Sequence, residues 1–508
     1  MLTLNHLHVI EPHEDLVRIE SNERNIRITL LPSAEPIKLV RVKWSLDTSF
    51  MQKVMPDTWG VALADMKWHT LPLPHPAQWY FAAYDGKYTH GFGVKTGCNS
   101  FCSWEIEADG VVLNCDVRNG GEGVTLTEPL LCAETVYYKS EDGQTPYAAC
   151  HAFCRLMSTK SSYPDRPIYG FNTWYYTYGN ITRASVLEDA RLCARLASKI
   201  DEGAPRPFMV IDDGWNKHGT SEYNGGPFVP NDDFADMAEV AKEISAIGCE
   251  PGIWVRPLLV LDELCPEIPE DCYSENQDHK CPGKVLDPTT PGAQKYIREL
   301  ISSLANSGYR LIKHDFTCPD LMGFDFLKPN LTREGWHWKD RTKTNAQVCK
   351  ELYTLIQEAA GGAYIIGCNI YNHLAAGIHD IVRSGCDTSG HHWEITRDYG
   401  INTLAFRTYQ NKAFFMTDAD CAAFTDRVPV DLNLQFSELL SISDSAFFIS
   451  AAPGILSDED EARLMDMFRR ITRPGSDLEP LDWQERMVPE QFFGDGQIRQ
   501  YSWDESPK

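Results

Sequence analysis

Short runs in which apolar and polar residues alternate fill the first 155 or so residues of the chain. Glycine, proline, asparagine and aspartate residues separate the runs, and no stretch with a helical period interrupts them. The clearest runs cover residues 26–30, 37–40, 79–81, 91–94 and 111–113. Because this alternation is typical of strands with one buried face, it predicts an N-terminal antiparallel β-sandwich. We place this domain at residues 1–157, with a helix over 147–157 at its end.

The pattern changes after a polar linker at residues 158–164, beyond which apolar runs alternate with amphipathic stretches. This arrangement is typical of βα units. Eight runs are expected to be strands, beginning near Ile168, Phe208, Glu250, Arg310, Tyr364, Asp380, Phe414 and Ala446. Eight parallel strands close a (β/α)8 TIM barrel, which we predict over residues 164–456. The segment between Cys368 and Asp380 is too short for an ordinary helix, so one unit should be degenerate.

Helix boundaries are clearest in one unit of the predicted barrel. Thr290 is a good N-cap, Pro291 suits the first helical position, and Gly308 suits the left-handed turn that ends a helix. An acidic helix follows the barrel from about residue 457. The remaining residues, to 508, hold one or two strands, so the fold class is multidomain β plus α/β with a short C-terminal β tail.

Polar and aromatic residues collect at the ends of the predicted barrel strands. The segments are Asn-Thr-Trp at 172–174, Asp-Asp-Gly-Trp at 212–215, Gly-Ile-Trp at 252–254, Lys-His-Asp at 313–315, Gly-Cys-Asn at 367–369 and Arg-Ser-Gly-Cys-Asp at 383–387. In TIM barrels the carboxyl ends of the strands form the catalytic face. Aromatic faces stack on sugar rings, while carboxylates, ammonium and guanidinium groups bind hydroxyls. The strand ends therefore predict a sugar-binding site.

Two aspartates in these segments have the chemistry that glycoside cleavage requires. Side chains alternate along a strand, so Lys313 and Asp315 point the same way, and the cation favours an ionised carboxylate. Asp315 therefore suits the group that attacks the anomeric carbon. Asp387 lies just past another strand and suits the acid that protonates the leaving oxygen. Alternatively, either aspartate could simply hydrogen-bond neighbouring backbone groups at a turn.

The same segments, in the same order over residues 165–450, resemble motifs of the α-galactosidases of glycoside hydrolase family 36, in the clan that includes family 27. The matching motifs are Asn-Thr-Trp-Tyr at 172–175, Asp-Asp-Gly-Trp at 212–215, Pro-Gly-Ile-Trp at 251–254, Lys-His-Asp-Phe at 313–316, Ile-Gly-Cys at 366–368 and Arg-Ser-Gly-Cys-Asp-Thr at 383–388. The stretch at 415–421 also resembles a late-barrel segment of that family.

The resemblance implies a role for each of these residues. Asp315 would be the nucleophile and Asp387 the acid/base. Asp212 and Asp213 would hold the O4 and O6 hydroxyls, which would select a sugar with an axial O4. Further residues would bind other hydroxyls or line the pocket: Lys313, Arg383, Trp174, Trp254 and Cys368. The family fold, an N-terminal sandwich, a barrel and a C-terminal β domain, agrees with the hydrophobic pattern.

Several features depart from the family or leave alternatives open. The C-terminal β domain of the family is larger than the segment here, and residues 389–394 differ from the family pattern. Asp418 and Asp420 are expected to brace the site. The activity implied is a retaining exo-α-galactosidase acting on α-galactosides or related oligosaccharides. An α-N-acetylgalactosaminidase, a transglycosidase of the same clan and an inactive sugar-binding barrel are the alternatives.

Composition narrows the partners and the compartment. The net charge of −25 repels nucleic acid and anionic membrane surfaces. The sixteen cysteines are scattered and no export signal is evident, which favours reduced thiols and a cytoplasmic location. Cys265, Cys272, Cys281 and His279 do not have the spacing of a zinc site, so we predict neither a metal nor another cofactor. Homo-oligomerisation stays open.

Overall fold

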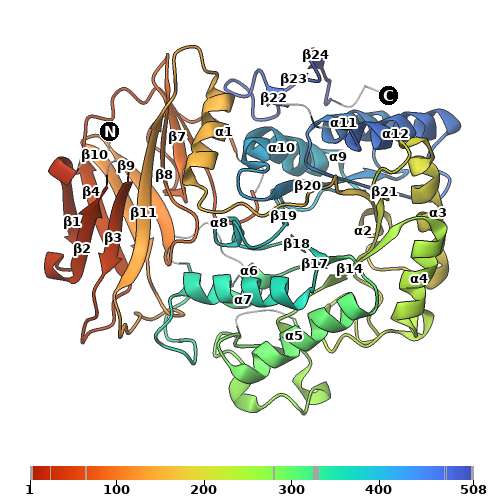
Figure 1. Ribbon diagram of the computed structural model, residues 1–508, viewed down its shortest axis with the longest axis horizontal. Coiled ribbons are helices and arrows are strands. Elements are labelled where there is room, and N and C mark those ends of the chain that lie inside the picture. Colours follow the sequence, from red (N-terminus) through yellow and green to blue (C-terminus); the bar gives the residue numbers. More distant parts are fainter. Residues whose placement is uncertain are drawn as a thin grey trace.

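The computed structural model describes residues 4–22, 25–62, 66–277, 281–323, 331–473, 475 and 478–504. A β-sandwich lies beside an α/β barrel, and a small C-terminal sheet completes the molecule (Figure 1). This arrangement confirms the predicted fold class. In the described part of the chain, no helix is both long and apolar enough to span a membrane.

The sandwich consists of two antiparallel sheets. One has the order β1 (Leu7–Glu11), β4 (Leu39–Ser45), β10 (Gly110–Asp116), β9 (Phe101–Glu107) and β6 (Ala77–Gln78). The other has the order β2 (Val17–Ser21), β3 (Asn25–Leu30), β11 (Leu130–Lys139), β8 (Thr89–Val94), β7 (Phe81–Tyr84) and β5 (Lys53–Pro56). Alternation determines the buried face: in β4, Val40, Val42 and Trp44 are buried while their neighbours are not. Helix α1 (Pro146–Met157) packs on β8.

One predicted strand of the sandwich is shorter than expected. The run at 79–81 was expected to be extended throughout, but the structure places its strand, β7, only from Phe81 onward. Trp79 has a φ of 67°, in the left-handed region that extended strands do not use. The apolar character of Trp79 and Tyr80 reflects burial of both side chains in the core rather than strand pairing.

The eight predicted barrel strands form a closed parallel barrel. In order they are β12 (Tyr169–Asn172), β13 (Phe208–Ile211), β14 (Glu250–Val255), β17 (Leu311–His314), β18 (Tyr364–Gly367), β19 (Ile381–Arg383), β20 (Met416–Phe424) and β21 (Ala446–Ala451). The larger outer helices are α3 (Arg183–Leu196), α4 (Met237–Ile247), α5 (Pro291–Asn306), α7 (Asn345–Ala359) and α11 (Val430–Ile442). The short unit contains only α8 (Asn372–Ala375), as the length of its segment predicted.

The signals at the ends of α5 act as expected. The Thr290 hydroxyl accepts a hydrogen bond from the Ala293 N–H, and Pro291 opens the helix. Gly308, with a φ of 103°, follows the last turn. These local signals therefore determine where the chain turns back toward β17.

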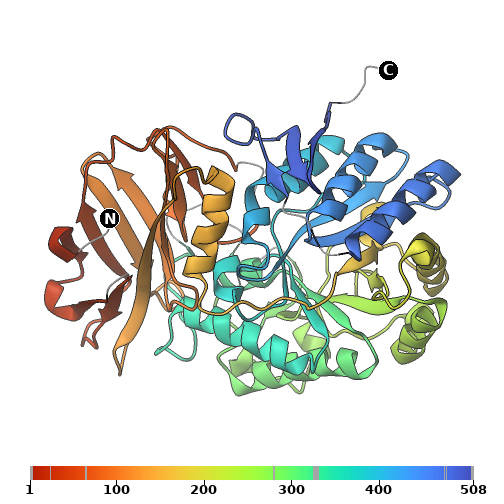
Figure 2. The ribbon, with the colours of Figure 1, turned by 45° about the horizontal axis from the view of Figure 1, so that its top comes forward.

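The C-terminal segment packs against both larger domains. It contains α12 (Asp458–Ile471) and a three-stranded sheet of β22 (Glu479–Pro480), β23 (Gln491–Gly494) and β24 (Gln497–Gln500). The sheet lies over the junction of the sandwich and the barrel (Figure 2). Trp483 is buried there, with its ring 5.2 Å from that of Trp68 in the N-terminal part and 5.3 Å from that of Phe406 in the barrel. The segment thus joins the two domains.

A buried ion pair connects the sandwich to the barrel. Arg407, in α10 (Asn402–Arg407), donates from Nε to Asp57 Oδ1 over 3.0 Å, and both side chains are at most 1% exposed. Arg407 Nη1 also donates to the Ser384 carbonyl oxygen over 2.7 Å, just after β19. The Ala62 N–H donates to the same Ser384 carbonyl over 3.1 Å, so the sandwich reaches the carboxyl end of a barrel strand.

Replacing Arg407 by methionine keeps much of the side-chain length but leaves Asp57 buried without its cation. Because breaking a buried ion pair from one side costs about 3–5 kcal/mol, we expect the free energy of unfolding in urea to fall by that amount. Arg486→Met is the matched control, because Arg486 pairs with Glu490 while 52% exposed, and should cost less than about 1 kcal/mol. Equal losses in the two variants would contradict the prediction.

Candidate active site

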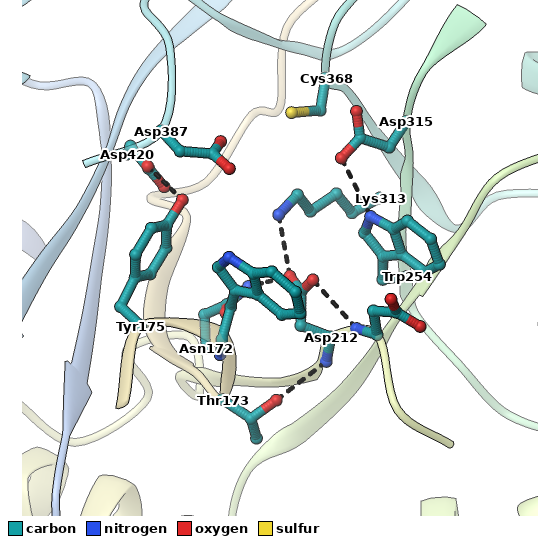
Figure 3. A network of polar contacts seen from close by, with 12 residues as sticks. Asn172, Thr173, Tyr175, Asp212, Trp254, Lys313, Asp315, Cys368, Asp387 and Asp420 are labelled. Atoms are coloured by element: carbon teal, nitrogen blue, oxygen red, sulfur yellow. Dashed lines mark hydrogen bonds and ion pairs between the residues drawn. The ribbon is translucent and has the colours of Figure 1, made fainter. Parts of the chain in front are cut away.

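The period of two along the barrel strands determines which polar side chains face the interior. One apolar core lies inside the barrel. Its members include one residue from each of four strands: Val210 in β13, Leu311 in β17, Ile366 in β18 and Ile381 in β19. Two positions beyond them come Asp212, Lys313, Cys368 and Arg383. Since successive side chains alternate faces, these four point into the carboxyl end of the barrel. Figure 3 shows Asp212, Lys313 and Cys368 around one space.

Asp315 and Asp387 face each other in this arrangement. Figure 3 shows their carboxyl groups directed into the same space from opposite sides, with Cys368 between them. The two positions differ in exposure: Asp315 is 6% exposed, whereas the Asp387 side chain is 53% exposed. The inner carboxyl is therefore held by protein, and the outer one is open to the entrance.

Three hydrogen-bond donors hold the Asp315 carboxylate. Trp254 Nε1 donates to Oδ2 over 3.1 Å, while Asn369 Nδ2 and the Phe316 N–H donate to Oδ1, each over 2.7 Å. Phe316 and Asn369 both have positive φ values, of 62° and 47°. Non-glycine residues adopt this conformation at a cost that the surrounding structure must offset. Both strained residues thus help to orient Asp315.

Asp212 is paired rather than free. Its Oδ2 accepts hydrogen bonds from Lys313 Nζ over 2.8 Å and from Asn172 Nδ2 over 2.7 Å. Burial alone would lower the pKa of Lys313, but the surrounding negative groups, first among them Asp212, hold this pKa well above its usual value. Lys313 is therefore a permanent cation beneath the space between Asp315 and Asp387.

Asp213 has a different environment from its neighbour. Its Oδ1 accepts a hydrogen bond from the Gly214 N–H over 2.8 Å. Burial raises the pKa of Asp213 to about 7, and the charges of Asp212 and Asp315 add to the shift. The adjacent pair thus combines one carboxylate bound to a cation with one carboxyl that titrates near neutral pH.

Arg383 links Asp387 to the barrel interior. This guanidinium is 1% exposed, and its Nη2 lies 3.1 Å from Asp387 Oδ1 and 2.9 Å from Asp420 Oδ2. Its Nη1 donates to the Cys368 sulfur over 3.5 Å. Burial raises the pKa of Asp418 to about 6. Asp418 and Asp420 line a small cavity together with Lys313 and Arg383, so both lie close to the site.

The tryptophans at the strand ends do not share one role. Trp174 lines a cleft of about 730 Å³ together with Tyr178, Asp213, Arg256 and Phe316. Trp254 is 2% exposed and uses its indole N–H to hold Asp315. Trp215, which the sequence also placed at a strand end, is 1% exposed and donates to the Trp254 carbonyl oxygen. Only Trp174 presents its ring to an open cleft.

Sequence reasoning assigned no role to Tyr175 or Asn369, although both lie within the strand-end segments. The Tyr175 hydroxyl donates a hydrogen bond to the Asp420 carboxylate, and the Asn369 side-chain amide donates one to the Asp315 carboxylate. The only signal available was their adjacency to Trp174 and Cys368.

In the described part of the chain, no group of three or more His, Cys, Asp or Glu side chains could hold a metal ion, and His279 lies outside that part.

Comparisons with known proteins agree with this fold. No family model matches the chain. The α-galactosidase TtGalA of Thermus thermophilus, in complex with p-nitrophenyl α-D-galactopyranoside, superposes with a TM-score of 0.65 at 17% identity, covering 98% of this chain and 96% of that one. The GH36 α-galactosidase AgaA of Geobacillus stearothermophilus gives a TM-score of 0.57 at 15% identity, covering 93% and 74%. These likenesses establish a shared fold.

The raised pKa of Asp213 has a consequence for stability. Between about pH 4, where the unfolded carboxyl loses its proton, and about pH 7, the native state binds more protons, so ionisation of Asp213 lowers stability as pH rises. One such group changes the free energy of unfolding by up to about 1.4 kcal/mol per pH unit. We expect Asp213→Asn, measured by urea unfolding at pH 5 and pH 7, to lose less stability over this range than the wild type.

A substitution at an exposed position separates this effect from a general change in charge. Asp233 lies on the surface in the same long loop. Asp233→Asn should keep the pH dependence of the wild type. The same fall in stability between pH 5 and pH 7 in wild type and Asp213→Asn would contradict the assignment.

Proposed function

We propose that the protein is a retaining exo-α-galactosidase, which removes terminal α-linked galactose from oligosaccharides or glycoconjugates. The observation that carries this proposal is the pair of carboxyl groups, Asp315 and Asp387, that point into one space above the Lys313 cation. Glycoside cleavage requires two carboxyl groups on either side of the scissile bond. The structural likeness to α-galactosidases in complex with p-nitrophenyl α-D-galactopyranoside and with stachyose adds support.

In the first step, a carboxylate oxygen of Asp315 bonds to the anomeric carbon of galactose. The bond from that carbon to the glycosidic oxygen breaks, and its electron pair leaves with the oxygen. Asp387 gives its proton to this oxygen, so the leaving group departs as an alcohol. The three donors on Asp315 suit this role because they present the carboxylate in one orientation.

In the second step, Asp387 acts as a base on a water molecule. Its carboxylate takes a proton while the water oxygen bonds to the anomeric carbon, and the bond to Asp315 breaks. Two displacements at the same carbon restore its original configuration. The 53% exposure of the Asp387 side chain supports this role, because both leaving group and water must reach it from the entrance.

The remaining residues would hold the hydroxyls of the sugar. Asp212 and Asp213 would bind O4 and O6, with Lys313 and Arg383 on other hydroxyls. Trp174 would line the pocket, and Cys368 would lie against the ring. The proximity of Asp212 to Lys313 supports this arrangement, because a fixed carboxylate and a fixed cation can bind neighbouring hydroxyls as acceptor and donor.

Variants of the two aspartates test the mechanism. We expect the wild type to hydrolyse an aryl α-galactoside in preference to the matching α-N-acetylgalactosaminide and α-glucoside. Asp315→Ala should lose turnover, and Asp387→Ala should lose about 10²–10⁴-fold with a poor leaving group. Asp233→Asn, on the surface, serves as the control.

Azide separates the two roles by the product that it forms. In Asp315→Ala, azide would replace the lost carboxylate and give β-galactosyl azide after a single inversion. In Asp387→Ala, azide would attack the galactosyl ester on Asp315 and give the α-anomer. Activity that persists in Asp315→Ala without azide would remove the nucleophile assignment, and faster hydrolysis of the α-N-acetylgalactosaminide would favour that specificity instead.

A further inference from the structure

Asp420 occupies a strained and buried position beside the candidate acid/base. It lies in β20, is 3% exposed, and has a φ of 72°, unusual for a non-glycine residue. The register between β20 and β21 shifts between Asp418 and Cys421, so the strand bulges where Asp420 enters the site. Such strain costs about 1–3 kcal/mol and persists only where surrounding contacts determine it.

One carboxylate oxygen of Asp420 collects these contacts. Oδ2 accepts hydrogen bonds from the Thr388 N–H over 2.8 Å, from the Thr388 hydroxyl over 3.1 Å, and from the Tyr175 hydroxyl. The same oxygen lies 2.9 Å from Arg383 Nη2. Three residues therefore direct donors at a single atom, although the Thr388 hydroxyl shares its one proton with the Cys421 carbonyl oxygen, 2.8 Å away. An anionic carboxylate satisfies this arrangement better than any neutral oxygen.

Two of these partners, Thr388 and Arg383, also determine the position of Asp387. Thr388 is its neighbour in the chain, so the bond from the Thr388 N–H to Asp420 determines where the backbone carries Asp387. The Arg383 nitrogen that contacts Asp420 is also the one that binds the Asp387 carboxyl over 3.1 Å. Figure 3 shows Asp420, with Tyr175 bound to it, behind Asp387 and away from Asp315.

We propose that Asp420 is the positioning residue for the acid/base of this enzyme: it holds the Thr388 backbone and the Arg383 guanidinium so that Asp387 can deliver its proton to the leaving oxygen. This inference rests on the proposed function. Asp420 contacts Arg383 and the Thr388 backbone, and it acts on Asp387 through them. Through Arg383, Asp420 also affects the binding of sugar hydroxyls, but that effect is the same for every galactoside. The effect through Asp387 falls only on substrates whose leaving oxygen needs a proton.

Two substrates that differ only in leaving group separate positioning of the acid from general damage. Methyl α-galactoside requires a proton on its leaving oxygen, whereas 2,4-dinitrophenyl α-galactoside releases a stable phenolate without one. Since a positioned acid contributes about 10²–10⁴-fold, we expect Asp420→Asn to reduce kcat/KM for the methyl glycoside at least about 10-fold more than for the dinitrophenyl glycoside. Asparagine places a neutral amide at this position, so the charge-assisted contacts with Arg383, Thr388 and Tyr175 are weakened.

Tyr175→Phe provides a milder variant, should Asp420→Asn not fold. It removes one donor to Asp420 and leaves the carboxylate in place. Because one hydrogen bond contributes about 1 kcal/mol, the ratio of the two kcat/KM values should change in the same direction by about 5-fold. Asp444→Asn is the matched control: Asp444 also has a positive φ, of 57°, and pairs with Lys412, but it precedes β21 at the opposite end of the barrel.

The outcomes are distinct. A larger loss on the methyl glycoside than on the dinitrophenyl glycoside in the Asp420 and Tyr175 variants, and absent in Asp444→Asn, supports the proposal. Equal loss on both substrates, or an unchanged ratio in folded variants, overturns it. If the wild type hydrolyses neither galactoside, the proposed function itself fails, and this result is seen before any variant is measured.

Discussion

The buried guanidinium of Arg383 is the group that the candidate site depends on most. It is 1% exposed, so its charge needs compensation inside the protein. Asp420 supplies one carboxylate from β20 and Asp387 another from the loop after β19, while the Cys368 sulfur accepts from the same group at the end of β18. Three consecutive strand ends are thus held together by one cation. A neutral side chain of similar size would leave these two carboxylates without the cation that lies beside both.

The loop that carries Asp387 also forms hydrogen bonds with the N-terminal β-sandwich. The backbone of Ala62 pairs with Ser384 and Cys386, and Arg407 bridges Asp57 to the Ser384 carbonyl. Contacts of this kind mean that the segment carrying Asp387 reaches its final geometry only when the sandwich is docked on the barrel. By contrast, Asp315 and Lys313 are held by residues of the barrel: Trp254 and Asn369 donate to Asp315, and Asp212 pairs with Lys313. The position of Asp315 therefore depends on the barrel, whereas the position of Asp387 also depends on the interface between the barrel and the sandwich.

Features that depend on local sequence pattern could be predicted, whereas features that depend on contacts between distant residues could not. The period of two predicted that Lys313 and Asp315 share a face, and eight apolar runs predicted the barrel, because both depend on local pattern. The left-handed turn at Trp79 and the bulge at Asp420 had no such signal, since each depends on contacts with distant residues. The sequence assigned Trp254 to the pocket and left the role of Trp215 open; in the structure Trp254 contacts Asp315, whereas the Trp215 indole donates to the Trp254 carbonyl oxygen.

Four residues around the candidate site have a left-handed backbone without being glycine: Tyr178, Phe316, Asn369 and Asp420. Each stores conformational energy that the native contacts hold in place. Glycine at such a position would relieve the backbone strain, but it would also remove a side chain that contributes to the site. Evolution or protein engineering toward a more heat-tolerant molecule would therefore meet a trade-off at these four positions, because relief of strain and loss of site contacts come together.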